Sequence, residues 1–206
     1  MPAFASVRGP TVPLMRFSTQ STVIGPLPKS IDAAKVVSRR PAVNNTPHCL
    51  IEYIDDGAGE EALKAIDQDI VQAVIERALA DEDPNPDARW QLIVLLVDPA
   101  RSAAIHAECF AMDDATDCMS FPDGTINPEN NRRLVGEVVV CPAIAHERCS
   151  QPGHPMQLGQ ELILYILHGV LHCLGYDDIE ADDRAEMWQR QKHLLAPWGI
   201  PVVDHG

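Results

Sequence analysis

The spacing of apolar positions divides the chain into predicted strands and helices. Short, nearly continuous apolar runs that are rich in β-branched residues are typical of buried strands. Four such runs are present, at residues 49–55, 90–98, 116–121 and 135–141. They predict a small sheet of about four strands.

Apolar positions three and four residues apart indicate helices elsewhere. Ala62, Ile66, Ile70, Val74 and Ala78 form one stripe on a predicted helix of about 20 residues. Further helices are predicted at residues 101–110, 158–174 and 180–195. The third of these four is apolar on nearly every side, so we expect it to run through the core, whereas the fourth is amphipathic. Strands and helices do not strictly alternate, which favours an α+β fold with a small mixed sheet packed by helices.

The chain divides near residue 48. Residues 1–48 contain seven prolines and six basic residues against one acidic residue, so we predict a disordered, basic, Pro-rich extension. Its composition also resembles an organellar transit peptide, which is the alternative interpretation. Residues 49–206 are predicted to form a single domain. A chain of 206 residues is long enough to bury a sizeable core.

Charge and hydropathy narrow the classes of function. The net charge is −14, and residues 49–206 carry 10 basic and 29 acidic residues. Such an acidic domain does not bind nucleic acid through its overall charge, so any RNA contact must be local or must use a bound cation. No apolar run reaches the 18 or so residues of a membrane span, and no secretory signal is present. We therefore expect a cytoplasmic protein with no membrane association.

The segment HGVLHCLGYDD (168–178) carries the candidate chemistry. His168 and His172 are four residues apart, which on a helix places both imidazoles on one face, within reach of one metal ion. Gly175 is suited to the left-handed conformation that ends a helix and reverses the chain. That turn brings Asp178 to the same ion as a third ligand, with Asp177 as the adjacent alternative. The pattern predicts one Zn²⁺ at the end of the buried helix, with a fourth position open for water.

The same segment resembles the signature HGxLHLxGYDH of the YbeY family of metal-dependent single-strand endoribonucleases. Two more segments resemble family strands in the same order: TDCMSFP (116–122) is similar to TDVLSFP, and VGEVVVCPAIA (135–145) is similar to a GDIVI-type strand. The resemblance covers about residues 49–196. It implies a zinc-dependent ribonuclease acting in ribosomal RNA maturation and ribosome quality control, with RNA and ribosomal small-subunit proteins as partners.

Two positions depart from the family pattern. Asp178 stands where the family has its third zinc-binding histidine, which adds a negative charge and favours harder ions. Phe110 stands where the family has an arginine proposed to contact phosphate. Arg101, Arg132 and Arg133 are the candidates to replace it.

The resemblance implies that the metal polarises a phosphate oxygen and supplies hydroxide at neutral pH. Ser120 is a candidate phosphate contact, the alternative being a solvated hydroxyl, and Tyr176 either stacks on a base or packs the turn. Two other classes of protein remain open. A metalloprotease shares the ligand spacing but normally has Glu after the first His, where Gly169 stands here. A non-catalytic, zinc-stabilised ribosome-assembly protein is the other. A two-His-one-carboxylate iron oxygenase shares the ligand set but normally uses a β-scaffold.

Overall fold

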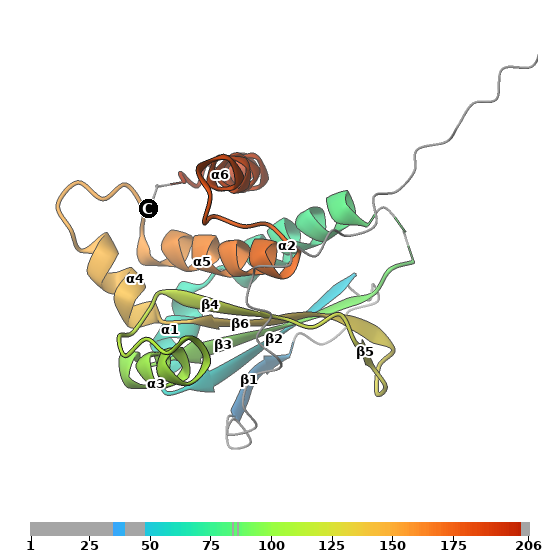
Figure 1. Ribbon diagram of the computed structural model, residues 1–206, viewed down its shortest axis with the longest axis horizontal. Coiled ribbons are helices and arrows are strands. Elements are labelled where there is room, and N and C mark those ends of the chain that lie inside the picture. Colours follow the sequence, from blue (N-terminus) through green and yellow to red (C-terminus); the bar gives the residue numbers. More distant parts are fainter. Residues whose placement is uncertain (1–34, 40–47, 84, 86, 203–206) are drawn as a thin grey trace, which may run out of the picture.

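The computed structural model describes residues 35–39, 48–83, 85 and 87–202 (Figure 1). The strands are β1 (Lys35–Arg39), β2 (Cys49–Asp56), β3 (Trp90–Val97), β4 (Cys118–Pro122), β5 (Ile126–Asn127) and β6 (Arg132–Val140). The helices are α1 (Glu60–Ala65), α2 (Gln68–Glu82), α3 (Pro99–Phe110), α4 (Pro142–Cys149), α5 (Leu158–Cys173) and α6 (Ala181–Leu195), followed by the 3-10 turn η2 (Ala196–Trp198).

The strands form one mixed sheet in the order β1-β2-β3-β6-β4, with β5 paired to the start of β6. The central strands β2, β3 and β6 are parallel, and the edge strands β1 and β4 are antiparallel to their neighbours. The α+β class and the small mixed sheet are therefore confirmed, with six strands instead of about four. The central strands carry the continuous apolar runs because both of their faces are covered.

The strand β1 corrects part of the prediction for residues 1–48. Lys35–Arg39 was expected to lack regular structure, but it pairs with β2 at the edge of the sheet. Five residues of mixed polarity, KVVSR, give no periodic signal of their own. The ladder with β2 satisfies their backbone groups. The remainder of the predicted extension, residues 1–34 and 40–47, lies outside the described residues.

Each face of the sheet has its own hydrophobic cluster. The larger one packs α2 and α5 against side chains such as Leu92, Val94 and Val138. The smaller one packs α3 against the opposite face through Leu95, Val97, Ile105, Met119, Phe121, Val139 and Cys141. Figure 1 shows α2 and α5 on one side of the sheet and α3 on the other. The alternation of Val138 and Val139 between the two clusters follows from the two-residue period of a strand.

The single long helix predicted after residue 60 is wrong, because the chain breaks between α1 and α2. Ile66 has an extended backbone, and Asp67 caps α2 by accepting hydrogen bonds from the backbone N–H groups of Asp69 and Ile70. The stripe continues across the break because Ala62 and Ile66 are buried together with the apolar face of α2. The apolar periodicity alone does not reveal such a break, because a polar residue at position 67 fits both the exposed face of one continuous helix and the N-cap of a new one.

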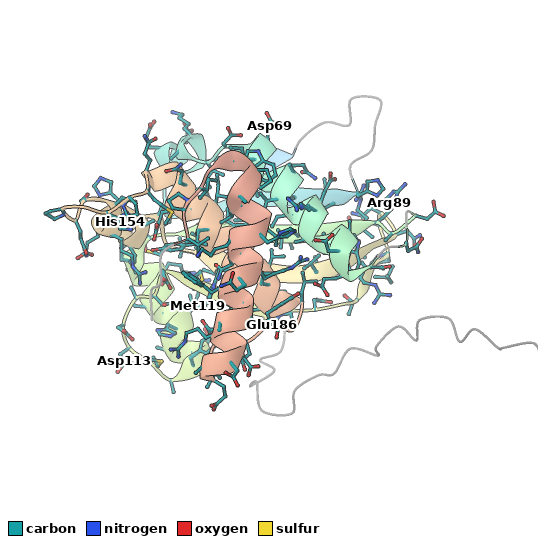
Figure 2. The ribbon with its side chains drawn as sticks, turned by 90° about the horizontal axis from the view of Figure 1, so that it is seen from above. Asp69, Arg89, Asp113, Met119, His154 and Glu186 are labelled. Carbon is teal, nitrogen blue, oxygen red and sulfur yellow. The ribbon has the colours of Figure 1, made fainter. Side chains whose placement is uncertain are left out.

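The outer layer consists of α6, which lies across α5 and α2 (Figure 2). Its inward residues Met187, Leu194 and Leu195 belong to the larger cluster. As a consequence α5 is covered on both sides, by the sheet and by α6, which explains why it is apolar nearly all round. Among the described helices none is long and apolar enough to cross a membrane.

Candidate metal centre

The candidate centre lies where α5 ends and the chain reverses. The amide of Tyr176 donates to the carbonyl of Leu171, and the amide of Gly175 donates to the carbonyl of His172, both at 3.0 Å. These two bonds make a Schellman motif, with Gly175 at φ +95° in the left-handed conformation. The turn predicted from Gly175 is present, and it carries Asp178 back toward the last two turns of α5.

Three donor atoms converge at this turn. The Nε2 atoms of His168 and His172 are 3.1 Å apart. The carboxylate of Asp178 places Oδ2 3.6 Å from His168 Nε2 and Oδ1 3.7 Å from His172 Nε2. The two imidazole side chains are 26% exposed and that of Asp178 is 41% exposed, so the cluster opens to solvent on one side. The cluster therefore combines two nitrogens and a carboxylate with access for a fourth ligand.

The donor set fits a tetrahedral metal ion. Bonds of about 2.0–2.2 Å at tetrahedral angles put neighbouring ligand atoms about 3.3–3.6 Å apart, and the separations of 3.1, 3.6 and 3.7 Å, the last two to different oxygens of Asp178, lie within a few tenths of an ångström of that range. Two imidazoles and a carboxylate are also a common protein ligand set for Zn²⁺. These residues can hold one divalent cation with only small adjustments of their side chains.

A backbone contact orients His172 for this role. Its Nδ1 lies 3.0 Å from the carbonyl oxygen of Tyr176, so Nδ1–H donates and the lone pair on Nε2 faces His168 and Asp178. Metal-binding histidines commonly donate their second ring nitrogen in this way. The Schellman turn therefore has two effects: it delivers Asp178, and its Tyr176 carbonyl fixes the tautomer of His172.

The adjacent carboxylate, Asp177, has a different task. Its Oδ1 accepts hydrogen bonds from the backbone N–H groups of Asp178, at 2.8 Å, and Ile179, at 3.3 Å. It thereby holds the loop in the conformation that points Asp178 at the histidines. The side chain of Tyr176 packs the turn, because its hydroxyl donates to Glu82 at the end of α2 over 2.7 Å.

Two glycines let α5 lie close to the sheet at this point. A Cβ at Gly169 would lie 2.5 Å from Cγ1 of Val138, and a Cβ at Gly136 would lie 2.8 Å from Sγ of Cys173. Ser120 is at the same contact, since its Oγ would be 3.1 Å from that Cβ at position 169. The Ser120 hydroxyl is therefore beneath α5, beside the residue that follows the first histidine. Position 169 faces the sheet and has no room for the glutamate of a metalloprotease.

The arginine candidates fall in different places. Arg132 is 7% exposed and donates to the carbonyls of His48 and Trp90, so it supports the fold and is not free to bind phosphate. Arg101 pairs with Asp56 at 2.8 Å. The guanidinium of Arg133 lies 6.0 Å from the ring centroid of Trp90. Phe110 ends α3 and packs against Phe121, a member of the cluster on the face of the sheet away from α5.

One arginine near the centre escapes sequence reasoning. Arg148 pairs with Asp117 at 3.2 Å, just before β4. Burial raises the pKa of the Cys118 thiol, with Asp117 and Asp178 raising it further and Arg148 opposing them. Arg148 and Asp178 therefore both act on one thiol at the start of β4. Only the packing of α4 beside α5 brings Arg148 here, and no local pattern signals it.

A shallow pocket of about 260 Å³ adjoins the centre. It is lined by Leu174, Gly175, Tyr176, Asp177, Asp183 and Glu186. Its carboxylates repel a phosphate group unless a cation offsets them. An anionic substrate would therefore meet its main attraction at the metal-binding cluster and not at the pocket wall.

The α+β fold and the helix-end triad define the class: a protein with a solvent-accessible candidate metal centre at the end of a buried helix. Comparison with known proteins identifies the family. The sequence model of Endoribonuclease YbeY matches residues 56–199. Endoribonuclease YbeY of Mycobacterium bovis (strain BCG / Pasteur 1173P2) is 36% identical over 154 residues, 71% of this chain and 84% of that protein. The Corynebacterium diphtheriae protein of the same name is 36% identical over 151 residues, 69% of this chain and 71% of its own length.

Among solved structures, the solution structure of TM1509 from Thermotoga maritima has a TM-score of 0.45 and 19% identity, covering 76% of this chain and 99% of its own. The chain belongs to the Endoribonuclease YbeY family. The predicted family is thus confirmed, and with it the expected class of enzyme, a metal-dependent endoribonuclease.

Proposed function

We propose that this protein is a zinc-dependent endoribonuclease that cuts single-stranded RNA during ribosomal RNA maturation and ribosome quality control. One Zn²⁺ is held by His168, His172 and Asp178. The observation that carries the proposal is the convergence of their three donor atoms within 3.7 Å. Membership of the Endoribonuclease YbeY family supports RNA as the substrate. We further propose cytoplasmic ribosomes, with their small-subunit proteins, as the place of action.

Each residue of the centre has a separate part in this proposal. The ion, when bound, supplies a Lewis acid for a phosphate oxygen and lowers the pKa of water at the open position. His168 and His172 provide neutral nitrogens, and the Tyr176 carbonyl keeps His172 in the required tautomer. Asp178 contributes the third donor and lowers the net charge of the centre, which makes it less acidifying than three histidines. Ser120, beneath Gly169, is kept as a weaker candidate for a hydrogen bond to phosphate.

The acidic character of the protein agrees with a cation-centred mode of RNA binding. With a net charge of −14 and carboxylates around the pocket, the protein has little general attraction for a polyanion. A divalent ion at the triad reverses the local charge where the scissile phosphate must sit. Peptide hydrolysis is disfavoured, because Gly169 has no general base to offer and its contact with Val138 leaves no space for one.

The test is cleavage of a labelled single-stranded RNA by the full chain. Wild type, His172→Ala and Asp178→Ala are compared with His193→Ala, a matched control on α6 whose ring contacts Arg77 and lies outside the triad. We expect wild type and the control to cut, both triad variants to lose cleavage and zinc together, and the same RNA in a duplex to resist. Cleavage that survives in His172→Ala would overturn the proposal. Zinc binding without cleavage would instead support a non-catalytic ribosome-assembly role.

A further inference from the structure

A second cluster of metal-ligating side chains lies at the opposite end of α5. Cys149 ends α4, His154 lies in the connection between α4 and α5, and Glu161 is in the first turn of α5. Their ligand atoms all lie within 4.8 Å of one another. In Figure 2, His154 is at one end of the molecule. Three segments of chain therefore meet at one thiol, one imidazole and one carboxylate.

The carboxylate of Glu161 makes this cluster unusual. Glu161 has no exposed surface, and the residues that follow it along α5, Leu162, Ile163 and Leu164, are apolar and buried as well. Burial raises the pKa of the Tyr165 hydroxyl, one turn further on, and the charge of Glu161 raises it further, while His154 Nε2 is 3.7 Å from Glu161 Oε2. Burying a carboxylate is costly, and a bound cation lowers that cost.

The imidazole of His154 is oriented suitably for a ligand. Its Nε2 is buried, is turned toward Glu161 and makes no hydrogen bond within the described part of the chain. The backbone N–H of Met156 donates to its Nδ1 at 3.3 Å, and the carbonyl oxygen of Met156 lies 3.4 Å from the same nitrogen. A cation at the cluster would require the tautomer in which Nδ1–H donates to this carbonyl and Nε2 keeps a lone pair, as in metal-binding histidines.

We propose that Cys149, His154 and Glu161 bind a second divalent cation, and that the donor set selects Zn²⁺. Thiolate, imidazole and carboxylate are all zinc ligands, and thiolate disfavours Mg²⁺ and Ca²⁺. On binding, the S–H bond of Cys149 breaks heterolytically: sulfur keeps the electron pair and bonds the cation, the proton goes to solvent, and no electrons are transferred. Water completes the coordination.

The charge environment of Cys149 agrees with this arrangement. Burial and the nearby negative charge of Glu161 raise the pKa of its thiol. A divalent cation would offset the carboxylate and stabilise the thiolate directly. A cation would therefore offset the same negative charge of Glu161 that makes the metal-free cluster unfavourable.

The second centre is structural and separate from the catalytic one. Glu161 and His168 are seven residues apart on α5, which corresponds to about 10 Å along the helix axis. Two-metal catalytic sites hold their ions about 3.5–4 Å apart, so the two clusters cannot act on one phosphate together. A cation here would instead fasten the α4–α5 connection to the start of the helix that carries His168 and His172.

Cobalt substitution tests the proposal with a signal that the catalytic centre cannot give. The full chain is stripped of metal and reconstituted with Co²⁺, and the near-ultraviolet thiolate-to-cobalt charge-transfer band is recorded with the metal content. Since the triad of His168, His172 and Asp178 has no cysteine, the band reports only the second centre. We expect two ions per chain and a full band in wild type, and one ion without the band in Cys149→Ser.

Matched variants separate this proposal from the catalytic one. Cys109→Ser, on α3 and outside the cluster, should keep the band, and His172→Ala should keep the band while losing one ion. Glu161→Gln, which preserves shape, should weaken cobalt binding at least 10-fold. In unmodified wild-type protein loaded with zinc, alkylation of Cys149 should become fast only after a chelator is added. A wild-type protein with no band and with Cys149 alkylated equally with and without zinc would overturn the proposal.

Discussion

Gly169 and Val138 are in contact so close that the helix carrying the two histidines has no room for any side chain there. A Cβ on residue 169 would lie 2.5 Å from one methyl carbon of Val138 and 3.0 Å from the other. The short distance between α5 and β6 is therefore possible only because residue 169 has no Cβ. Since His168 directly precedes this contact, the position of the metal centre above the sheet depends on it.

Gly169→Ala should destabilise the protein by about 1–3 kcal/mol, because overpacking a rigid interface forces the helix or the strand to shift. Urea unfolding would measure the loss. In the double variant Gly169→Ala/Val138→Ala the second change removes the clashing methyl groups, so the two effects should not add. If they add fully, the contact is not the cause.

Asp178→His should keep a bound metal and change which metal is preferred. Three imidazoles favour zinc and cobalt over manganese and magnesium, whereas a carboxylate oxygen favours the harder ions. Competition between Zn²⁺ and Mn²⁺ should shift toward zinc by about 10-fold or more. Asp177→Asn is the control, because an amide oxygen can still accept from the backbone N–H groups of Asp178 and Ile179. An equal shift in the control would show that loop geometry, and not the ligand, sets the preference.

Tyr176→Phe should cost stability without loss of metal. The variant removes the hydroxyl that donates to Glu82 and keeps the backbone carbonyl that orients His172. A hydrogen bond of this kind contributes about 0.5–1.5 kcal/mol. Thermal unfolding should show the loss while zinc content stays at the wild-type level. A drop in zinc content would mean that the hydrogen bond from the Tyr176 hydroxyl to Glu82 holds the turn in place.

Arg148→Gln should weaken binding of single-stranded RNA and reduce its dependence on salt. Arg148 pairs with Asp117 just before β4, and we expect it to replace the family arginine that Phe110 displaces. Each lost phosphate contact lowers the slope of log affinity against log salt by about 0.7 for a single strand. Fluorescence anisotropy at several salt concentrations measures the slope. Arg77→Gln, an exposed change on α2, should leave it unaltered.

Arg132→Gln should affect stability and not RNA affinity. Its guanidinium is buried and donates to the carbonyls of His48 and Trp90, so the shortened side chain loses both hydrogen bonds. The expected loss is about 1–3 kcal/mol in urea unfolding. Unchanged RNA affinity at a temperature where the variant is folded would complete the assignment. A lowered RNA affinity with unchanged stability would show instead that Arg132 contacts phosphate.

Local features of the sequence were sufficient to predict that His168, His172 and Asp178 lie together as a candidate metal centre. The four-residue spacing of His168 and His172 fixes their common face on any helix, and Gly175 fixes the turn that follows. Asp178 is reached within six residues, so each step of that prediction depends on short-range geometry. The strands with continuous apolar runs were likewise predictable, because burial on both faces leaves a direct mark on composition.

Features that depend on contacts between distant segments were not predictable in this way. The edge strand β1 forms only because β2 offers its backbone, and the break before Asp67 follows from how α1 and α2 separately meet the core. Arg148 reaches Asp117 through the packing of α4 on α5. The burial of Arg132 likewise excludes it from RNA binding, and its sequence context gives no sign of that burial.

The sequence by itself determined the fold class, the family and the triad of His168, His172 and Asp178, since helical periodicity and a glycine turn act over one or two turns of chain. Only the tertiary structure decided that Cys149, His154 and Glu161 converge and that Gly169 faces Val138. The physical reason is that these contacts depend on how α4, α5 and β6 pack together. No local spacing encodes the distance between elements that meet only after the core has formed.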